Sequence, residues 1–316
     1  MFRSNYSLKG RHCRSVQDFT PEEMMQILHS ARDMKYRFLN GERPRLLEGR
    51  TLGMVFQKPS LRTVVSFEVG MNQLGGHALY LGPDQIKINE RETTEDIAMV
   101  LSGYVDGIMA RVFSHKIIED LAKYSRVPVI NGLSDFEHPC QIFGDLLTVL
   151  ERREELRGLK VVFVGDGNNV ANSWALAAAR FGMHLVVASP SGFELKPNVM
   201  EMVATDARSF HTSGRVEQTR DPLKAVKDAD VIYTDVWASM GQESEREERK
   251  RLFKGYQLDT RLLDAAKPDV LLMHCLPAHY GEEIAAGMQK DSRSVIFQQA
   301  ENRLHAQKAI LVSLMR

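Results

Sequence analysis

The sequence contains little cysteine and no surplus of either charge. Its 316 residues include three cysteines, Cys13, Cys140 and Cys275, and no two of them form a CxxC pair. This argues against a disulfide framework or a structural zinc site and favours a reducing compartment, which we expect to be the cytoplasm. The 41 basic residues equal the 41 acidic ones, whereas binding to nucleic acid needs positive charge to displace the counterions of phosphates. We therefore expect no nucleic-acid partner.

Long apolar runs are also lacking. No stretch approaches the ~20 residues of a membrane span, and the start of the chain has no apolar core of the signal-peptide kind. We therefore expect no membrane partner. Hydrophobic residues make up 43% of the chain and charged residues 26%, as in ordinary globular proteins. At roughly 150 residues per domain, the length predicts two domains.

Strand-like apolar runs alternate with helical stretches, a pattern typical of an α/β fold with a largely parallel sheet. Strands are expected at residues 51–56, 77–81, 107–113, 127–131, 160–164, 184–188, 231–234 and 270–274. Helices are expected at about 21–38, 64–74, 139–156, 170–181 and 300–316. The charge-dense segment 243–251 predicts a water-facing helix with i,i+4 ion pairs. Two successive βα series indicate two domains that meet near residues 135–140.

A polar loop follows the first expected strand and precedes a helix. It reads Ser60-Leu61-Arg62-Thr63, and the free N–H groups and dipole of the following helix favour an anion there. Two hydroxyls and a guanidinium suit phosphate, because Arg can donate a fork of hydrogen bonds to it. The alternative is an ordinary Ser N-cap beside a solvated Arg.

A second candidate turn, Gly165 to Val170, follows the strand at 160–164 and reads GDGNNV. It is similar to the GxGxxG dinucleotide fingerprint, so a nicotinamide-dependent oxidoreductase is one alternative function. However, the third glycine is replaced by Val170, and the next strand runs into Ser189-Pro190-Ser191, with no acidic residue to hold a ribose. A loop that presents Asn side chains to a small polar ligand fits better.

Four further residues could carry chemistry. Asp235 and Cys275 follow expected strands, where parallel sheets bind ligands; Cys275 could be a nucleophile, a substrate hydrogen-bond partner or a buried apolar filler. His138 could be a ligand or a core histidine. Arg111 lies in an apolar strand and is either part of a structural ion pair or a ligand clamp. Together with the anion loop, these groups suit transfer of a phosphate-activated group to a small polar acceptor.

The chain resembles the aspartate/ornithine carbamoyltransferase family in a series of segments that occur in the family's order over almost the whole length. These segments are KPSLRT with SFEVG, MARVF, NGLSDFEHPCQ, FVGDGNNVANS, YTDVWASMGQE, MHCLPAH and QAENRLHA. The resemblance implies two doubly wound parallel-sheet domains joined by interdomain helices, with the C-terminal helix returning to the first domain. Residues 1–136, completed by a helix at about 298–316, are then expected to bind carbamoyl phosphate, and residues 137–297 to bind ornithine. A homotrimer or an assembly of trimers is also implied.

The same resemblance implies the site residues. Carbamoyl phosphate is expected to contact Ser60, Leu61, Arg62, Thr63, Arg111, His138, Gln141, Cys275, Leu276 and Arg303. Ornithine is expected to contact Asn169, Asp235, Ser239 and Met240. Catalytic roles fall to Cys275, Arg62, Arg111 and His138. The stretch Asp235 to Gly241 is the family's substrate label and favours ornithine over aspartate, acetylornithine or putrescine.

The implied reaction converts carbamoyl phosphate and L-ornithine to L-citrulline and phosphate, either in arginine biosynthesis or in arginine breakdown, and needs no metal or organic cofactor. Two departures from the family stand out. Val64 occupies the last position of a loop that often reads S-x-R-T-R, and Arg91 stands where some members have Lys. Three alternatives stay open: the same transfer to putrescine or an acylated ornithine, the oxidoreductase, and a binding protein without catalysis.

Overall fold

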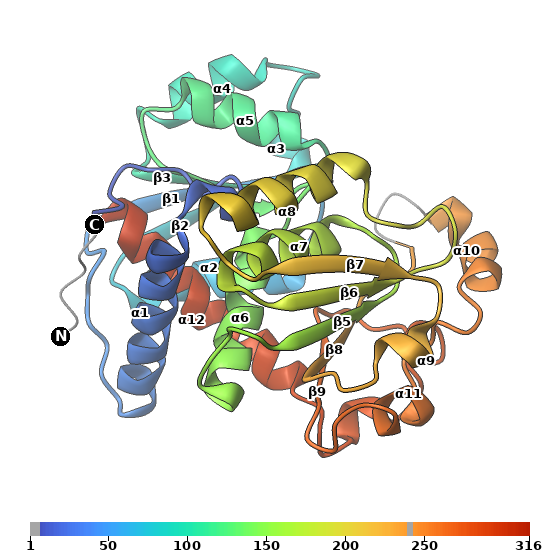
Figure 1. The fold of residues 1–316 in the computed structure, drawn as a ribbon. Helices are drawn as coiled ribbons and strands as arrows, with labels where there is room; N and C mark the ends of the chain where they lie inside the picture. The colour runs from blue at the N-terminus through green and yellow to red at the C-terminus, as the bar shows by residue number, and fades with distance from the viewer. Residues whose placement is uncertain (1–6, 239–242) are drawn as a thin grey trace. The chain divides into compact units, whose positions relative to one another are not determined.

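The computed structural model describes residues 7–238 and 243–316 of the chain. Contacts divide the chain into two units, Met1–Leu147 with Glu301–Arg316, and Thr148–Ala300. Each unit contains one parallel sheet (Figure 1). The predicted α/β class with two parallel-sheet domains is therefore confirmed, and most of the C-terminal helix belongs with the first unit.

The sheet of the first unit has the strand order β2-β1-β3-β4, with every neighbouring pair parallel. Its strands are β1 Thr51–Phe56, β2 His77–Leu81, β3 Gly107–Arg111 and β4 Val129–Leu133. Its helices are η1 Val16–Asp18, α1 Pro21–Leu39, α2 Leu61–Gln73, α3 Pro83–Ile86, α4 Thr94–Leu101 and α5 His115–Tyr124. Two helices, α6 Pro139–Arg153 and α12 Ile296–Met315, contribute residues to both units.

The sheet of the second unit has the strand order β7-β6-β5-β8-β9 and is again parallel throughout. Its strands are β5 Lys160–Val164, β6 His184–Ala188, β7 Arg215–Thr219, β8 Val231–Thr234 and β9 Leu271–His274. Its helices are α7 Asn169–Phe181, α8 Pro197–Ser209, α9 Pro222–Ala225, η2 Glu243–Glu245, α10 Arg246–Leu252, α11 Thr260–Asp264 and η3 Met288–Lys290.

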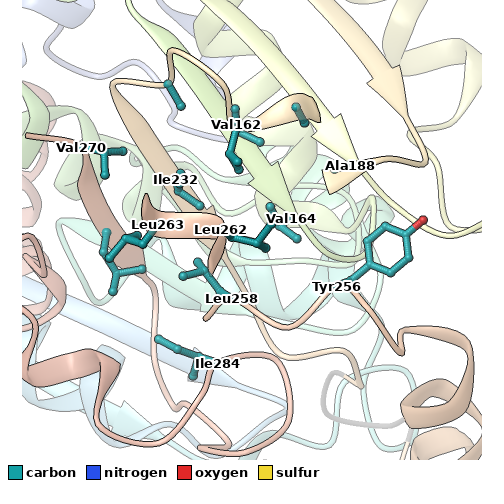
Figure 2. Packing of buried hydrophobic residues seen from close by; sticks show 14 of the residues in the cluster. Val162, Val164, Ala188, Ile232, Tyr256, Leu258, Leu262, Leu263, Val270 and Ile284 are labelled. Atoms are coloured by element: carbon teal, nitrogen blue, oxygen red, sulfur yellow. The ribbon is translucent and has the colours of Figure 1, made fainter. Parts of the chain in front are cut away.

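Buried side chains of the second sheet form a core with residues from the chain segments between β8 and β9 and after β9. Val162, Val164 and Ile232 project from β5 and β8 toward Leu258 and Ile284 (Figure 2). A separate core in the first unit joins β1, β3 and β4 to α4 and α5. Among the residues described, no helix is both long and apolar enough to cross a membrane.

Two strand-order reversals position the functional residues. In the first sheet the order reverses between β1 and β3, and in the second between β5 and β8. Parallel sheets bind ligands outside the carboxyl ends of the strands at such a reversal, because the helices that follow the two strands turn away to opposite faces. The loop that carries Arg62 follows β1, and the turn that begins at Gly165 follows β5.

The sequence missed edge strand β7 and several helices. Arg215–Thr219 reads RVEQT and is largely exposed, so it lacks the apolar run by which the other strands were predicted. The predicted helix at 243–251 forms as η2 and α10, residues 244–248 are exposed as expected, and the expected ion pair of Glu245 with Arg249 is present. Arg249 is only 7% exposed, because its guanidinium reaches into the second unit.

Candidate active site

The start of α2 places backbone N–H groups beside polar side chains. Ser60 is the N-cap, and its hydroxyl accepts a hydrogen bond from the Thr63 N–H at 3.3 Å. Thr63 is fully buried, whereas the Leu61 side chain is 76% exposed and Arg62 is half-buried. Ser60 therefore does form the N-cap that the alternative to phosphate binding supposed, its contact with phosphate stays a prediction, and the first turn of the helix directs Thr63 inward.

Two buried arginines converge on the Thr63 hydroxyl. Arg111, the last residue of β3, donates from Nη1 at 3.4 Å, and Arg303, on α12, donates from Nη2 at 3.2 Å. Arg303 also donates from Nη1 to Gln141 Oε1 at 3.1 Å, and Gln141 in turn donates to Asp145 Oδ1 at 2.8 Å. A hydroxyl and an amide do not neutralise a cation, so these contacts orient the guanidinium groups without cancelling their charge.

His138 lies beside the same guanidinium groups, immediately before α6. Its ring is 4% exposed. Burial lowers the pKa of His138 well below its ordinary value, and the charges of Arg303, Arg111 and Arg62 lower it further. His138 is therefore a neutral imidazole at neutral pH, able to donate one hydrogen bond without adding positive charge. We define Arg62, Thr63, Arg111, His138, Gln141 and Arg303 as the arginine cluster.

The second unit gathers acidic and neutral polar groups at its strand-order reversal. Asp235 follows β8, and its carboxylate accepts from the Cys275 thiol at 2.9 Å, from Asn168 Nδ2 at 2.8 Å and from the Val236 N–H at 2.8 Å. Cys275 follows β9, which pairs with β8. Asp235 and Cys275 are 7% and 9% exposed. We define Asn168, Asp235 and Cys275 as the carboxylate cluster.

The turn after β5 is built for packing against its own chain. Adding a Cβ to Gly167 would bring it within 2.7 Å of the backbone of Glu194 and Leu195, and the Gly167 N–H donates to the Phe193 carbonyl at 2.8 Å. In a dinucleotide site this glycine lets the backbone approach a pyrophosphate. Here the same space holds the segment 193–195, which weighs against the nicotinamide alternative.

Asn168 is a functional candidate that the sequence reasoning missed. It is the N-cap of α7, and its Oδ1 accepts from the N–H groups of Val170 and Ala171 while its Nδ2 reaches Asp235. The predicted Asn169 is the first residue of the helix and is half-buried. The strong preference of Asn for helix N-caps was the available signal.

Arg249 joins two segments that adjoin the carboxylate cluster in the sequence, the β5–α7 turn and the segment after β8. Its guanidinium donates to Asp166 Oδ2 at 2.7 Å, to Glu245 Oε2 at 2.8 Å and to the Trp237 carbonyl at 2.8 Å. Burial raises the pKa of Asp166, against the opposing effect of Arg249, and the negative charge of Asp235 raises it further. Arg249 therefore ties the β5–α7 turn to the segment that follows Asp235.

The predicted residues divide between the two units. The first unit contains Ser60, Leu61, Arg62, Thr63, Arg111, His138, Gln141 and Arg303. The second unit contains Asn169, Asp235, Cys275 and Leu276, and the predicted Ser239 and Met240 lie outside the described residues. Leu276 has a backbone φ of 58°, in the left-handed region, and a cis peptide bond to Pro277.

Asp235, His274 and Cys275 are close enough together to be considered as metal ligands, with one ligand atom from each within 4.8 Å of the others. The thiol of Cys275 and the carboxylate of Asp235 instead hydrogen-bond to each other, and both ring nitrogens of His274 contact protein groups. These contacts account for the positions of all three side chains. The expectation that the reaction needs no metal stays a prediction.

Comparisons with known proteins match both units to one family. Residues 11–151 match the carbamoyl-P binding domain of aspartate/ornithine carbamoyltransferases, and residues 157–314 match the Asp/Orn binding domain. The chain is 54% identical to an ornithine carbamoyltransferase of Thermococcus kodakarensis over 98% of both sequences. It is also 54% identical to the anabolic ornithine carbamoyltransferase of Pyrococcus furiosus, again over 98% of both. The solved structure of ornithine carbamoyltransferase from P. furiosus superposes with a TM-score of 0.94 over 98% of both chains.

Proposed function

Because the chain belongs to the aspartate/ornithine carbamoyltransferase family, we propose that it transfers the carbamoyl group of carbamoyl phosphate to the side-chain amine of L-ornithine. The products are L-citrulline and phosphate. The observation that carries the assignment is the arginine cluster, in which Arg111 and Arg303 converge on the buried Thr63 hydroxyl. Burial first, and then the charges of Arg303, Arg111 and Arg62, lower the pKa of the adjacent His138. Such a concentration of positive charge suits a doubly charged phosphate. The name of the P. furiosus relative includes "anabolic", which supports a role in arginine biosynthesis.

The two units divide the substrates in this proposal. Residues 1–136 with about 298–316 bind carbamoyl phosphate, joined by His138 and Gln141 of the arginine cluster, and the rest of residues 137–297 bind ornithine. The family match of residues 11–151 to a carbamoyl-P binding domain supports this division. So does the contrast in charge, because the arginine cluster lies in the first unit and the carboxylate of Asp235 in the second. The exact boundary at 136/137 stays a prediction.

The arginine cluster serves the donor substrate. Arg62, Arg111 and Arg303 bind the phosphate, together with the N–H groups and hydroxyls of Ser60 and Thr63. Neutral His138 donates a hydrogen bond to the carbonyl oxygen, where negative charge develops as the amine attacks. Donors fixed before the reaction stabilise that charge at no cost of reorganisation, and each typically contributes about 100- to 1000-fold in rate. Gln141 holds Arg303 in place.

The carboxylate cluster serves the acceptor. The ornithine side-chain amine has a pKa of about 10, like that of lysine, and must lose a proton before it can attack. Asp235 attracts and orients the cationic substrate, and Cys275, bonded to Asp235, places a thiol beside it. The C–N bond forms as the bond from the carbonyl carbon to the phosphate oxygen breaks, and the leaving phosphate can carry the released proton. Asn169, Ser239, Met240, Cys275 and Leu276 complete the proposed substrate contacts.

Self-association is the second part of the proposal. Leu61, Val65 and Val69 recur every four residues along α2 and are 76%, 48% and 37% exposed. The edge strand β2 exposes Leu79 and Tyr80 at 42% and 46%. Exposed apolar side chains of this size and an uncovered sheet edge are features of contact surfaces. We take a second copy of the chain as the occupant, in a homotrimer or an assembly of trimers.

The cysteines support a proposal for the cellular compartment in which the protein works. Cys13, Cys140 and Cys275 are all free thiols in the structure. Burial raises the pKa of Cys140 to about 12 and that of Cys13 well above its ordinary value. Free thiols are usual in a reducing compartment, so we propose that the enzyme works in the cytoplasm.

The test is a citrulline assay on the purified protein with carbamoyl phosphate and a panel of amines. We expect kcat/KM for ornithine to exceed the values for putrescine and N-acetylornithine by more than about 100-fold, because putrescine lacks the α-carboxylate of ornithine and N-acetylornithine lacks its α-ammonium group. If ornithine gives no citrulline while putrescine is carbamoylated, the acceptor substrate would be putrescine. A calorimetric titration with NADH should show no binding; binding would revive the oxidoreductase alternative.

A further inference from the structure

His274 is the last residue of β9 and directly precedes Cys275, and its side chain is fully buried. Its Nδ1 accepts the backbone N–H of Leu276 at 2.9 Å, and its Nε2 lies 3.1 Å from Glu283 Oε1. Because a backbone N–H can only donate, Nδ1 is the unprotonated nitrogen. Nε2 therefore carries the proton and donates a hydrogen bond to the Glu283 carboxylate. The imidazole thus has two partners, one on each side.

Glu283 is a rigid support for this ring. Its side chain is fully buried, and Oε1 also accepts from the His279 N–H at 2.5 Å. Its carbonyl accepts from the Leu258 N–H at 2.8 Å, and the next residue, Ile284, forms a β-bridge with Leu258. Leu258 and Ile284 lie in the core of the second unit (Figure 2). The backbone of Glu283 is therefore fixed beside the core, and the His279 N–H holds its carboxylate.

The segment that His274 holds has an unusual backbone. Leu276 adopts a φ of 58°, a region that residues other than glycine rarely occupy unless the surroundings impose it. The bond from Leu276 N–H to His274 Nδ1 spans Cys275 and closes a local ring around it. Cys275 Sγ in turn donates to Asp235 at 2.9 Å. The orientation of the thiol thus depends on a contact made by its neighbour's side chain.

We propose that His274, through the bond from the Leu276 N–H to its Nδ1, is a positioning residue that holds Cys275 and Leu276 in the geometry needed for carbamoyl transfer. This inference rests on the proposed function. The contacts run from the core at Ile284 through Glu283 and His274 to the Leu276 N–H. His274 acts through its neighbours, because both of its ring nitrogens are used by protein groups.

Two substitutions of His274 distinguish a role in positioning Cys275 from a role in packing alone. In His274→Asn the amide oxygen can replace Nδ1 and accept the Leu276 N–H, whereas in His274→Gln the longer amide can replace Nε2 and contact Glu283. We expect His274→Gln to lower kcat/KM by about 10- to 100-fold, as displacement of a positioned group does, and His274→Asn to stay within about fivefold of the parent. Equal losses in both variants would contradict the proposal.

The matched control is His184→Asn. His184 is also a histidine of the second sheet with a carboxylate partner, its Nε2 lying 3.1 Å from Glu217. It stands at the first residue of β6, and its ring contacts only Glu217 and Arg215 among the interactions described for it. We expect parent-like kcat and KM from this variant. A loss as large as that of His274→Gln would show that removing any such histidine is harmful.

The reactivity of Cys275 gives a readout that needs no turnover. Cys13 and Cys140 are fully buried, whereas Cys275 is 9% exposed, so mass spectrometry after iodoacetamide treatment should find Cys275 modified first. We expect His274→Gln to change the alkylation rate of Cys275 by more than about fivefold, and His274→Asn and His184→Asn to change it by less than about twofold. An unchanged rate in His274→Gln would overturn the proposal even if its melting temperature falls.

A measurement on the parent protein covers the case in which the variants do not fold. In protein labelled with 15N-histidine, the His274 resonances should show an unprotonated Nδ1 and a protonated Nε2; the opposite tautomer would refute the proposal. Neither this spectrum nor the alkylation rate depends on citrulline formation. A parent protein without activity would therefore count against the proposed function, while the position of Cys275 would still be tested.

Discussion

The arginine cluster and the carboxylate cluster occupy equivalent places in two similar sheets and have opposite character. Each lies at a strand-order reversal of a parallel sheet. The first surrounds the Thr63 hydroxyl and a neutral histidine with guanidinium groups. The second surrounds the Asp235 carboxylate with a thiol, an amide and a backbone N–H. The fold determines where a ligand binds, and the side chains determine the charge of that ligand.

The difference in charge between the two clusters supports the proposal that each substrate has a site of its own. Carbamoyl phosphate is an anion whose phosphate calls for several cationic donors. The ornithine side chain carries an ammonium group that calls for a carboxylate. Under the proposed assignment, the contrast in charge between the clusters would supply specificity as well as affinity.

The largest expected effect comes from removing a positive charge from the arginine cluster, which weakens the difference in charge between the two clusters. We expect Arg62→Ala to lower kcat by about 100- to 1000-fold, because a donor to the phosphate and to the developing charge is lost. Its melting temperature should stay close to the parent value, since Arg62 is half-exposed at the start of a helix. The control is Arg37→Ala, which removes an exposed arginine paired with Asp33. Activity within a factor of ten of the parent would show that this loop does not bind phosphate.

Removing the negative charge of the carboxylate cluster should act on the other substrate. We expect Asp235→Asn to raise the KM for ornithine by about 10- to 100-fold, because hydrogen bonds to charged groups contribute about 1.5–3 kcal/mol. Steady-state kinetics with each substrate varied in turn would measure this. Asp228→Asn, at an exposed position of the same unit, serves as the control. Equal losses of affinity for both substrates would contradict the division between the clusters.

The buried histidine of the arginine cluster predicts a pH effect on stability. The pKa of His138 is lowered in the folded protein, so the unfolded chain binds the proton more readily and stability falls as the pH drops below the ordinary value of about 6.5. Between pH 6.5 and 5.5 we expect the parent to lose about 1 kcal/mol more than His138→Asn. Urea unfolding at several pH values measures the difference. Parallel pH profiles would show that His138 is not held neutral.

The smallest expected effect concerns Asn168 and distinguishes its role as a helix N-cap from its bond to Asp235. Asn168→Ala removes a helix N-cap, which costs about 0.5–2 kcal/mol, and also a donor to Asp235. Asn168→Ser keeps a capping oxygen and loses that donor. We therefore expect thermal unfolding to show recovery of stability in Asn168→Ser, while the KM for ornithine stays raised by severalfold in both variants. If KM recovers together with stability, the bond to Asp235 has no part in substrate binding.

The sequence predicted the buried parts of the fold well. The expected strands at 51–56, 77–81, 160–164, 184–188 and 231–234 match the observed bounds of five strands, because apolar runs and turn residues mark them locally. Strand β7 was missed, since its exposed residues carry no such run. Arg249 was expected to face water because its i,i+4 partner Glu245 is close in sequence. Its contact with Asp166 joins residues 83 positions apart, and local patterns cannot reveal such a pairing.

The candidate site shows the same limit. Loop position and residue type pointed to Arg62, Asp235 and Cys275 individually, and the family resemblance joined them to Gln141 and Arg303. The sequence alone left Arg111 as either an ion pair or a ligand clamp, because only folding brings its guanidinium to the Thr63 hydroxyl. It also overlooked Asn168, whose capping role is visible locally but whose bond to Asp235 is not.

Calorimetric titration of carbamoyl phosphate into the parent, Arg62→Ala and Asp235→Asn proteins tests the central claim most directly. The account predicts that Arg62→Ala weakens binding by at least about tenfold, because a charge-assisted contact to phosphate is lost, and that Asp235→Asn leaves the dissociation constant within about twofold of the parent. Weaker binding in Asp235→Asn with unchanged binding in Arg62→Ala would contradict the assignment of the anionic substrate to the arginine cluster.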